Sequence, residues 1–276
     1  MNRATHLRCG VHMLDLAQPR VMGILNVTPD SFFDGGRYVD REQALDHARQ
    51  MFADGADIVD IGGESTRPGA APVPLEDELA RVIPLVETLA SEQRLVSVDT
   101  MKPAVMKAAI SAGAAMINDV RALSEPGALD TVAASAVAIC VMHMRGLPHN
   151  MQAAPTYVDV VEEVHGFLVQ RAQACEAAGI AAARIAIDPG FGFGKTMAHN
   201  LALLRSLSSL AAAGYPVLVG LSRKSTIGTI TGRDPLERIA GSIGAALAAV
   251  ARGAAIVRVH DVRETVDALK VWHAFS

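Results

Sequence analysis

The chain has 276 residues, of which 50% are hydrophobic and 20% charged, so it has ample apolar material for a core and is not a disordered chain. Its length fits one α/β barrel or two ordinary domains. The 25 basic and 29 acidic residues give a net charge of −4 without a block of like charges, which argues against a general nucleic-acid surface and a polybasic membrane patch.

The cysteines Cys9, Cys140 and Cys175 are widely spaced and form no CxxC pair. This pattern argues against a disulfide framework or a structural zinc site and is typical of a reducing compartment, so we expect a cytoplasmic protein. Residues 1–20 are expected to form an N-terminal extension, and they lack the continuous apolar region of a signal peptide. The apolar run from Ile239 to Val250 spans about a dozen residues, against roughly 20 for a membrane helix, so we expect no membrane partner.

Short β-branched runs alternate with longer segments of helical spacing throughout residues 21–276. This alternation predicts eight strand–helix units in a single domain. The predicted strands are 21–27, 58–61, 95–99, 116–119, 137–142, 185–188, 217–220 and 256–259. The predicted helices are 41–54, 75–92, 103–112, 127–135, 158–178, 198–213, 235–252 and 262–275.

Parallel strands joined by helices predict a (β/α)8 TIM barrel, with an open doubly wound sheet as the alternative. Polar residues follow nearly every predicted strand. They would converge on one rim of a barrel, whereas an open sheet gathers its ligand groups at a topological switch point, so we favour the barrel. These strand-end residues are Asn26, Asp60 with Glu64, Asp99, Asn118 with Asp119, His143, Asp188, Lys224 and His260.

The glycine-rich segment 188–196 ends in Gly-Lys-Thr but is not a Walker A loop. That motif needs a glycine five positions before Gly194, and the residue there is Pro189. We expect the glycines to let the backbone pass close to a flat ligand beside Asp188. A purely structural turn is the alternative.

Asp99 and Asp188 each end an apolar strand, where an unpaired carboxylate is costly to desolvate. An aminopyrimidine edge would supply paired N–H groups, and Asn118 could donate and accept hydrogen bonds beside them. In the alternative interpretation, lysines or backbone amides satisfy these carboxylates.

Arg258 and His260 are two residues apart on the last predicted strand, so both side chains point the same way. Together with residues 222–225 they fit an anion site, because barrels often bind phosphate after strands seven and eight. Alternatively, Arg258 pairs with Asp261 or Glu264. The CxxH spacing of residues 140–143 is more typical of a buried cysteine and a polar rim than of a metal site.

Two long loops carry further candidates. Phe32 and Phe33 lie in a polar, glycine-containing loop, where they fit either a lid over the site or packing against the helices. In the next loop, Thr66 and Arg67 are within reach of the same rim, unless Arg67 pairs with Glu64.

Seven motifs occur in order from about residue 21 to the C-terminus. They are MGILNVTPDSF (22–32), DIGGESTRPG (60–69), VDT (98–100), INDV (117–120), DPGFGFGK (188–195), SRKS (222–225) and RVHDV (258–262). Together they resemble the dihydropteroate synthases, folate-pathway enzymes that sulfonamides target. The first two motifs are highly specific.

The resemblance implies a pterin-binding TIM barrel that joins 7,8-dihydropterin-6-ylmethyl diphosphate to 4-aminobenzoate, releasing diphosphate and 7,8-dihydropteroate. The residues it implies for the pterin ring are Asp99, Asn118, Asp188 and Lys224, with Met142, Phe193 and Gly220 packing nearby. Those for the diphosphate are Asn26, Arg258 and His260, with Asn26 also contacting Mg2+. Those for 4-aminobenzoate are Thr66, Arg67, Pro68 and Ser225, with Phe32 and Phe33 of the lid, while Asp34 helps to order that loop. The catalytic groups would be Asp99, Asp188, Lys224, Arg258 and His260.

Breaking the bond at the pterin methylene leaves negative charge on the diphosphate, which Mg2+, Arg258 and His260 would stabilise. An electron-rich pterin favours a loose, SN1-like path in which Asp99 and Asp188 stabilise the cationic ring. Two other functions stay open. One is a methyltetrahydrofolate-dependent methyltransferase domain, and the other is a non-catalytic pterin-binding paralogue.

The resemblance also implies a homodimer. The apolar positions of the last two predicted helices fit either the core or an interface between two copies. They are Ile239, Ile243, Leu247, Val266 and Leu269.

Overall fold

The structure is a computed structural model that describes residues 4–27, 37–66, 69–146 and 150–275, without the side chains of residues 37–40. Of the predicted site residues, Phe32, Phe33, Asp34, Arg67 and Pro68 lie outside the described residues.

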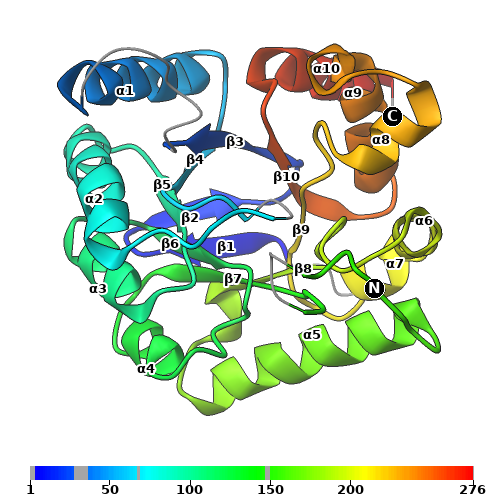
Figure 1. Ribbon diagram of the computed structural model, residues 1–276, viewed down its shortest axis with the longest axis horizontal. Helices are drawn as coiled ribbons and strands as arrows, with labels where there is room; N and C mark the ends of the chain where they lie inside the picture. Colours follow the sequence, from blue (N-terminus) through cyan, green and yellow to red (C-terminus); the bar gives the residue numbers. More distant parts are fainter. Residues whose placement is uncertain (1–3, 28–36, 67–68, 147–149, 276) are drawn as a thin grey trace.

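Eight parallel strands form a closed barrel (Figure 1). The barrel closes where the last strand pairs with the first, with Ile256 opposite Arg20 and Val259 opposite Gly23. This closure confirms the predicted TIM barrel, and the open sheet was wrong. The strands are β3 (Arg20–Asn26), β4 (Ile58–Gly62), β5 (Val96–Asp99), β6 (Met116–Asp119), β7 (Ala138–Met142), β8 (Ile185–Asp188), β9 (Val217–Val219) and β10 (Ala254–Val259).

Helices surround the barrel (Figure 1). The long ones agree with prediction to within a few residues, but the predicted helix 198–213 is two helices that meet at Ser206. The Ser209 hydroxyl donates to the Ser206 carbonyl, a side-chain bond that competes with regular helix. Among the described residues, no helix combines the length and apolar character that crossing a membrane requires. The helices are α1 (Arg37–Ala53), α2 (Leu75–Ser91), α3 (Pro103–Ser111), α4 (Ala128–Ala133), α5 (Val160–Ala177), α6 (Met197–Arg205), α7 (Leu207–Ala211), α8 (Ser225–Thr231), α9 (Ile239–Val250) and α10 (Val262–Phe275), with short 3-10 turns at Ala182–Arg184 and Pro235–Glu237.

The strand side chains divide between two apolar cores. Because side chains alternate along a strand, Val59 and Ile61 of β4 pack outward with the helices, whereas Ile58 packs inside the barrel. The barrel interior is therefore filled by every second residue of each strand. Its apolar strand residues are Met22, Ile58, Met116, Ala138, Cys140, Ala186, Leu218 and Ile256.

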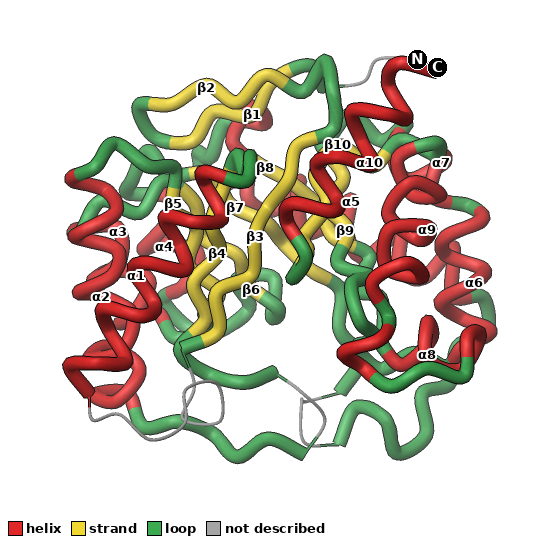
Figure 2. The backbone as a smooth tube through the Cα atoms, turned by 90° about the horizontal axis from the view of Figure 1, so that it is seen from above, coloured by secondary structure: helices red, strands yellow, loops and turns green. Residues whose placement is uncertain are grey.

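An N-terminal hairpin seals one end of the barrel. Strands β1 (His6–Cys9) and β2 (His12–Asp15) pair antiparallel and lie across that end in Figure 2. Leu7, Cys9 and Leu14 of the hairpin join the interior apolar core. The polar strand ends therefore face the opposite, carboxyl end of the barrel, where TIM-barrel active sites lie.

Candidate active site

The carboxyl end of the barrel interior collects the predicted polar residues. They lie two positions beyond the interior apolar residues, so the alternation that buries Ile58, Met116 and Ala186 also turns Asp60, Asn118 and Asp188 inward. The strand register places neighbours side by side, with Asp99 opposite Asn118 and Met142 opposite Asp188. This end of the interior therefore holds Asn26, Asp60, Asp99, Asn118, Met142, Asp188, Gly220 and Arg258.

The Arg258 side chain lies between two carboxylates. Its Nε lies 2.6 Å from Asp60 Oδ2, and its Nη2 lies 2.8 Å from Asp99 Oδ2. The alternative pairing of Arg258 with Asp261 or Glu264 is wrong, because Arg258 binds these two carboxylates instead. Asp261 binds Arg223. The two carboxylates raise the pKa of Arg258 despite its burial, so the guanidinium stays charged.

Asp60 connects Arg258 to the amide of Asn118. The same Asp60 Oδ2 that binds Arg258 accepts a hydrogen bond from Asn118 Nδ2 at 3.0 Å. Asp60 is fully buried, and its Oδ1 has no hydrogen-bond partner among the described atoms. Our site prediction omitted Asp60, although it was among the strand-end polar residues.

The site carboxylates are held where ionisation is costly. Burial raises the pKa of Asp99 to about 7, against the lowering effect of Arg258. Burial also raises the pKa of Asp188, whose Oδ1 accepts a hydrogen bond from the Gly190 N–H at 2.7 Å. Because carboxylates with perturbed pKa values that gather in a polar cluster are typical of functional sites, the pattern favours a binding or catalytic role.

Lys224 approaches Asp188 from the loop after β9. Its Nζ donates to the Phe191 carbonyl and lies 4.7 Å from the centroid of the Phe193 ring. Burial lowers the pKa of Lys224 to about 8, although Asp188 opposes that shift. A Cβ on Gly220 would lie 3.8 Å from this Nζ. The predicted ring-binding set is therefore gathered in one place.

His260 faces Ser222 across the β9 and β10 ends. The Ser222 Oγ lies 3.0 Å from His260 Nδ1 and 3.2 Å from the His260 backbone nitrogen. Because Oγ accepts from the backbone N–H, its own proton can go to Nδ1, which leaves Nε2 of a neutral imidazole protonated. That tautomer presents a donor suited to an anion.

Two neighbouring strand-end residues face the outside of the barrel rather than the rim. Asp119 accepts hydrogen bonds from the backbone N–H groups of Arg121 and Leu123. His143 packs edge-on against Phe167 of α5, and burial lowers its pKa to about 3. Both residues therefore lie at the carboxyl end of the barrel, as expected, but their side chains point away from its interior.

In the glycine-rich segment 188–196, close backbone contacts require glycine at two positions. A Cβ on Gly190 would lie 2.0 Å from the His143 carbonyl oxygen, and one on Gly194 would lie 2.3 Å from that of Arg145. Both residues also have positive φ. Within the segment, buried Lys195 donates to the carbonyls of His143, Gly190 and Phe193, so its role here is structural.

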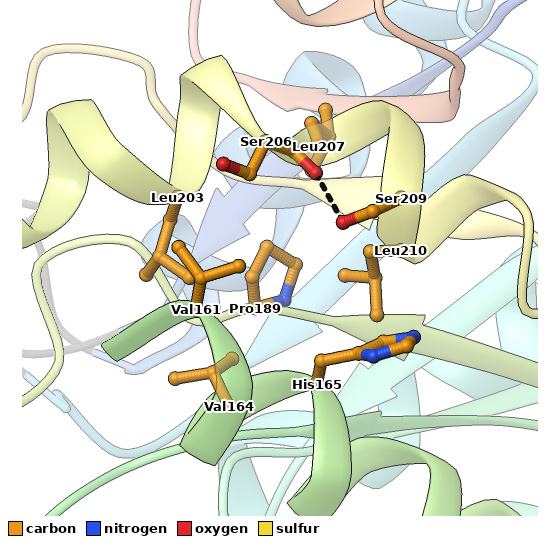
Figure 3. A pocket seen from close by; sticks show the side chains of 9 residues that line it. All are labelled: Val161, Val164, His165, Pro189, Leu203, Ser206, Leu207, Ser209 and Leu210. Carbon is orange, nitrogen blue, oxygen red and sulfur yellow. Dashed lines mark hydrogen bonds between the residues drawn. The ribbon is translucent and has the colours of Figure 1, made fainter. Parts of the chain in front are cut away.

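Of the remaining predicted residues, Thr66 and Ser225 are more exposed than the interior carboxylates, and the others lie outside the described residues. Thr66 is partly exposed and Ser225 is exposed. Among the described residues, no group of three or more His, Cys, Asp or Glu could hold a metal ion. A small cavity of about 10 Å³ is elsewhere, between α5, α6 and α7, where Val164, Leu203 and Leu210 line it (Figure 3). It belongs to the helical layer and not to the site.

Comparisons with known proteins agree on one family. The family described as "Pterin binding enzyme" matches residues 22–260. The dihydropteroate synthase of Neisseria meningitidis serogroup C is 53% identical over 274 residues, covering 98% of this chain and 97% of the relative.

Two solved structures superpose closely. Xanthomonas albilineans dihydropteroate synthase with 4-aminobenzoic acid gives a TM-score of 0.93 at 55% identity, covering 99% of this chain and 98% of that one. Burkholderia cenocepacia dihydropteroate synthase complexed with 7,8-dihydropteroate gives 0.91 at 53% identity, covering 100% and 98%. On these matches over nearly its whole length, the chain belongs to the dihydropteroate synthase family of pterin binding enzymes.

Proposed function

We propose that this chain joins 7,8-dihydropterin-6-ylmethyl diphosphate to 4-aminobenzoate. The C–O bond between the methylene and the diphosphate breaks, the amine nitrogen bonds to the methylene carbon, and the amine loses a proton. The observation that supports this most is the partly buried Arg258 guanidinium between Asp60 and Asp99, beside Asn118, Asp188 and Lys224. This arrangement combines a cation that can bind a phosphate with hydrogen-bond acceptors that can bind an aminopyrimidine. A methyltransferase would not need the cation for a phosphate.

The pterin ring is assigned to the interior face of β5, β6 and β8. Asp99 and Asp188 would accept from ring N–H groups, because a buried carboxylate with few donors of its own gains most from them. Asn118 and Lys224 would bind the polar edge between them. Met142, Phe193 and Gly220 would contact the faces of the ring.

The diphosphate is assigned to Asn26, Arg258 and His260. The contacts of Arg258 to Asp60 and Asp99 use Nε and Nη2, so the five-donor guanidinium retains N–H groups for an anion. Negative charge grows on the diphosphate as the C–O bond breaks, and fixed donors stabilise it most at that point.

Mg2+ fits this end of the barrel as an ion shared with the substrate. Mg2+ prefers oxygen ligands and commonly binds through substrate phosphates and water with few protein groups. The Asn26 side-chain oxygen lies at the barrel end near Gly62, where a Cβ would be 3.7 Å from it. We propose Asn26 as its protein ligand. When bound, Mg2+ would neutralise charge on the departing diphosphate.

The 4-aminobenzoate pocket is assigned to Thr66, Arg67, Pro68 and Ser225, with Phe32, Phe33 and Asp34 of the first loop. Thr66 and Ser225 are the accessible members within the described chain. Sulfonamides resemble 4-aminobenzoate in shape, so they are expected to compete at this pocket.

The reaction is proposed to follow a loose, SN1-like path. The pterin ring can delocalise positive charge from the methylene while the bond to diphosphate breaks. Asp99 and Asp188 would stabilise that charge from within hydrogen-bonding range, so no protein nucleophile is needed.

The test is diphosphate release from the pterin diphosphate with Mg2+, with and without 4-aminobenzoate. Release that requires 4-aminobenzoate and yields 7,8-dihydropteroate supports the proposal. Binding of the pterin diphosphate without release would replace it with a non-catalytic pterin-binding role. Lack of binding would refute the assignment of the barrel-end residues.

We also propose that two copies associate through α9 and α10. Val271, Trp272 and Phe275 are exposed and line an apolar groove with Leu247, whereas the predicted face residue Val266 is buried in the core. Exposed apolar patches of this kind commonly mark interfaces. Trp272→Glu should convert a dimer to a monomer in sedimentation experiments, and an unchanged sedimentation coefficient would refute this interface.

Two further assignments follow from the sequence. Residues 1–20 are proposed as an extension to a single barrel domain at 21–276, with Arg20 as the residue at which the extension passes into β3. The three cysteines are free and buried, as suits a reducing compartment, and the cytoplasm is the proposed location.

A further inference from the structure

The loop between β4 and α2 has its two ends joined by Lys102, a residue from outside that loop. Glu64 begins the loop and Val73 lies near its end. Lys102 Nζ lies 2.7 Å from Glu64 Oε2 and 2.8 Å from the Val73 carbonyl oxygen. The other Glu64 oxygen, Oε1, accepts the Val73 N–H at 3.1 Å. Lys102 and Glu64 therefore close the base of the loop.

The third N–H group of Lys102 binds Glu78 of α2, the helix that follows the loop. Nζ lies 2.5 Å from Oε2 of Glu78 in α2, and Glu78 Oε1 accepts from the Thr100 hydroxyl at 2.6 Å. An ammonium has three donors, and these contacts use all of them. The Glu78 side chain is fully buried and that of Glu64 is 7% exposed, whereas that of Lys102 is 25% exposed, so salt screens this cluster less than it would a pair on the open surface.

Lys102 stays charged in this environment. Hydrogen bonds and charge from Glu64 and Glu78 raise its pKa, more than offsetting the effect of burial. Two buried carboxylates without that cation would repel each other. Among the described residues, Lys102 therefore supplies the cation that pairs with Glu64 at the loop base. The Val73 N–H bond to Glu64 and the bond from Arg81 Nη1 to the Gly63 carbonyl at 3.0 Å add support without a second ion pair.

The cluster of Lys102, Glu64 and Glu78 lies between the proposed pterin and 4-aminobenzoate regions, but we expect it to position only the 4-aminobenzoate region. Lys102 lies three residues beyond Asp99. Asp99 itself is held by the pairing of β5 with β6, where the Thr100 N–H donates to the Asn118 carbonyl at 3.1 Å. Loss of Lys102 would therefore free the loop base and leave Asp99 in place.

We infer that Lys102 is a positioning residue for the second substrate: by fixing Glu64 and Val73, it holds Thr66 where 4-aminobenzoate binds. This inference rests on the proposed function, because it takes Thr66 as part of the 4-aminobenzoate pocket. Lys102 does not touch substrate in this assignment. Its loss should change the affinity for one substrate and not for the other.

The test compares Lys102→Met with Lys107→Met, an exposed lysine of α3. We expect Lys102→Met to raise KM for 4-aminobenzoate about tenfold, equivalent to ~1.4 kcal/mol of binding. KM for the pterin diphosphate should stay within about twofold, and the control should resemble wild type. Lys102→Arg should restore part of the loss. Equal changes in both KM values, or the same change in the control, would refute the inference.

A second variant and a second readout cover the case in which Lys102→Met is unstable. Glu64→Gln breaks the ion pair but leaves Lys102 bound to Glu78, so its KM change should have the same direction. Hydrogen exchange at the Val73 amide should accelerate in both variants, and unchanged exchange would contradict the tether. If the wild type forms no dihydropteroate, the proposed function fails and this inference fails with it. If the wild type is active, the variants alone decide.

Discussion

Asp60→Asn tests whether the interior carboxylates hold Arg258 in place. Arg258 lies 2.6 Å from Asp60 and 2.8 Å from Asp99, and Asn118 shares the Asp60 oxygen. A hydrogen bond to a charged group contributes about 1.5–3 kcal/mol, and stripping one partner from a buried ion pair costs about 3–5 kcal/mol. Because Arg258 keeps Asp99, we expect the free energy of unfolding to fall by about 2–3 kcal/mol, as measured by urea denaturation.

The same substitution should move the pH dependence of the reaction. The negative charge of Asp60 adds to burial in raising the pKa of Asp99 to about 7. If catalysis requires ionised Asp99, kcat/KM of the wild type falls as the pH drops through that value. Without the Asp60 charge the pKa of Asp99 falls, so the decline should occur at lower pH.

Asp57→Asn is the matched control. Asp57 pairs with Arg20 at 3.2 Å at the sealed end of the barrel, where both side chains are partly exposed, and its Oδ2 accepts the Val21 N–H at 2.8 Å, a bond that the amide oxygen of asparagine can keep. Its loss should cost less than about 1 kcal/mol and leave the pH profile unchanged. The reasoning fails if Asp60→Asn lowers the free energy of unfolding no more than Asp57→Asn does. It also fails if kcat/KM of Asp60→Asn declines at the same acidic pH as that of the wild type.

Three further substitutions test other parts of the site. Asp188→Asn should lower kcat far more than it weakens 4-aminobenzoate binding; an unchanged kcat would remove Asp188 from the mechanism. Gly190→Ala should lower the free energy of unfolding in urea by at least about 3 kcal/mol, because its Cβ would lie 2.0 Å from a carbonyl oxygen. Gly179→Ala is the control, since Gly179 also has positive φ but has no atom near its Cβ position, and it should lower the free energy by about 1 kcal/mol. Burial lowers the pKa of His143 to about 3 in the folded protein, so its contribution to stability is present above pH ~6.5 and is lost on acidification toward pH ~3. His143→Gln should therefore lose less stability than the wild type over that pH range. The control His6→Gln, at an exposed position, should lose as much as the wild type.

The strands were predictable because their chemistry is local. Most are short runs rich in β-branched residues, with a polar residue at or shortly after the end of the strand, and β6 and β8 match the predicted bounds. Helix α8 was not predicted. Its sequence from Ser225 to Thr231 is rich in β-branched residues with weak helix propensity, yet buried Ile227 packs it against Gly241 of α9.

The inward or outward direction of each strand end was not predictable. Parallel barrel strands are buried on both faces, so apolar residues occupy positions that point in both directions and carry no sign of which face is inside. Asn118 and Asp119 are adjacent, but one binds Asp60 within the barrel and the other accepts hydrogen bonds from two backbone N–H groups outside it. Closure of the barrel decides between them, and closure involves all eight strands.

Charge clusters formed across distant segments were also beyond a local reading. Lys102 and Glu64 are 38 residues apart and Arg258 and Asp60 are 198 apart. Each pair is visible only when strands and loops are brought together. The hairpin β1–β2, by contrast, had a local signal, because buried Leu7 and Cys9 alternate with exposed residues before a turn at Gly10.

That hairpin also affects the chemistry at the opposite end of the barrel. Leu7, Cys9 and Leu14 join the interior core and so place apolar side chains between solvent at the amino end and the polar groups at the carboxyl end. Burial is the largest cause of the raised pKa values of Asp99 and Asp188 and of the lowered pKa of Lys224. An open amino end would hydrate these groups and move their pKa values back toward the ordinary range. The charge states of the site therefore depend on a segment that carries none of its motifs.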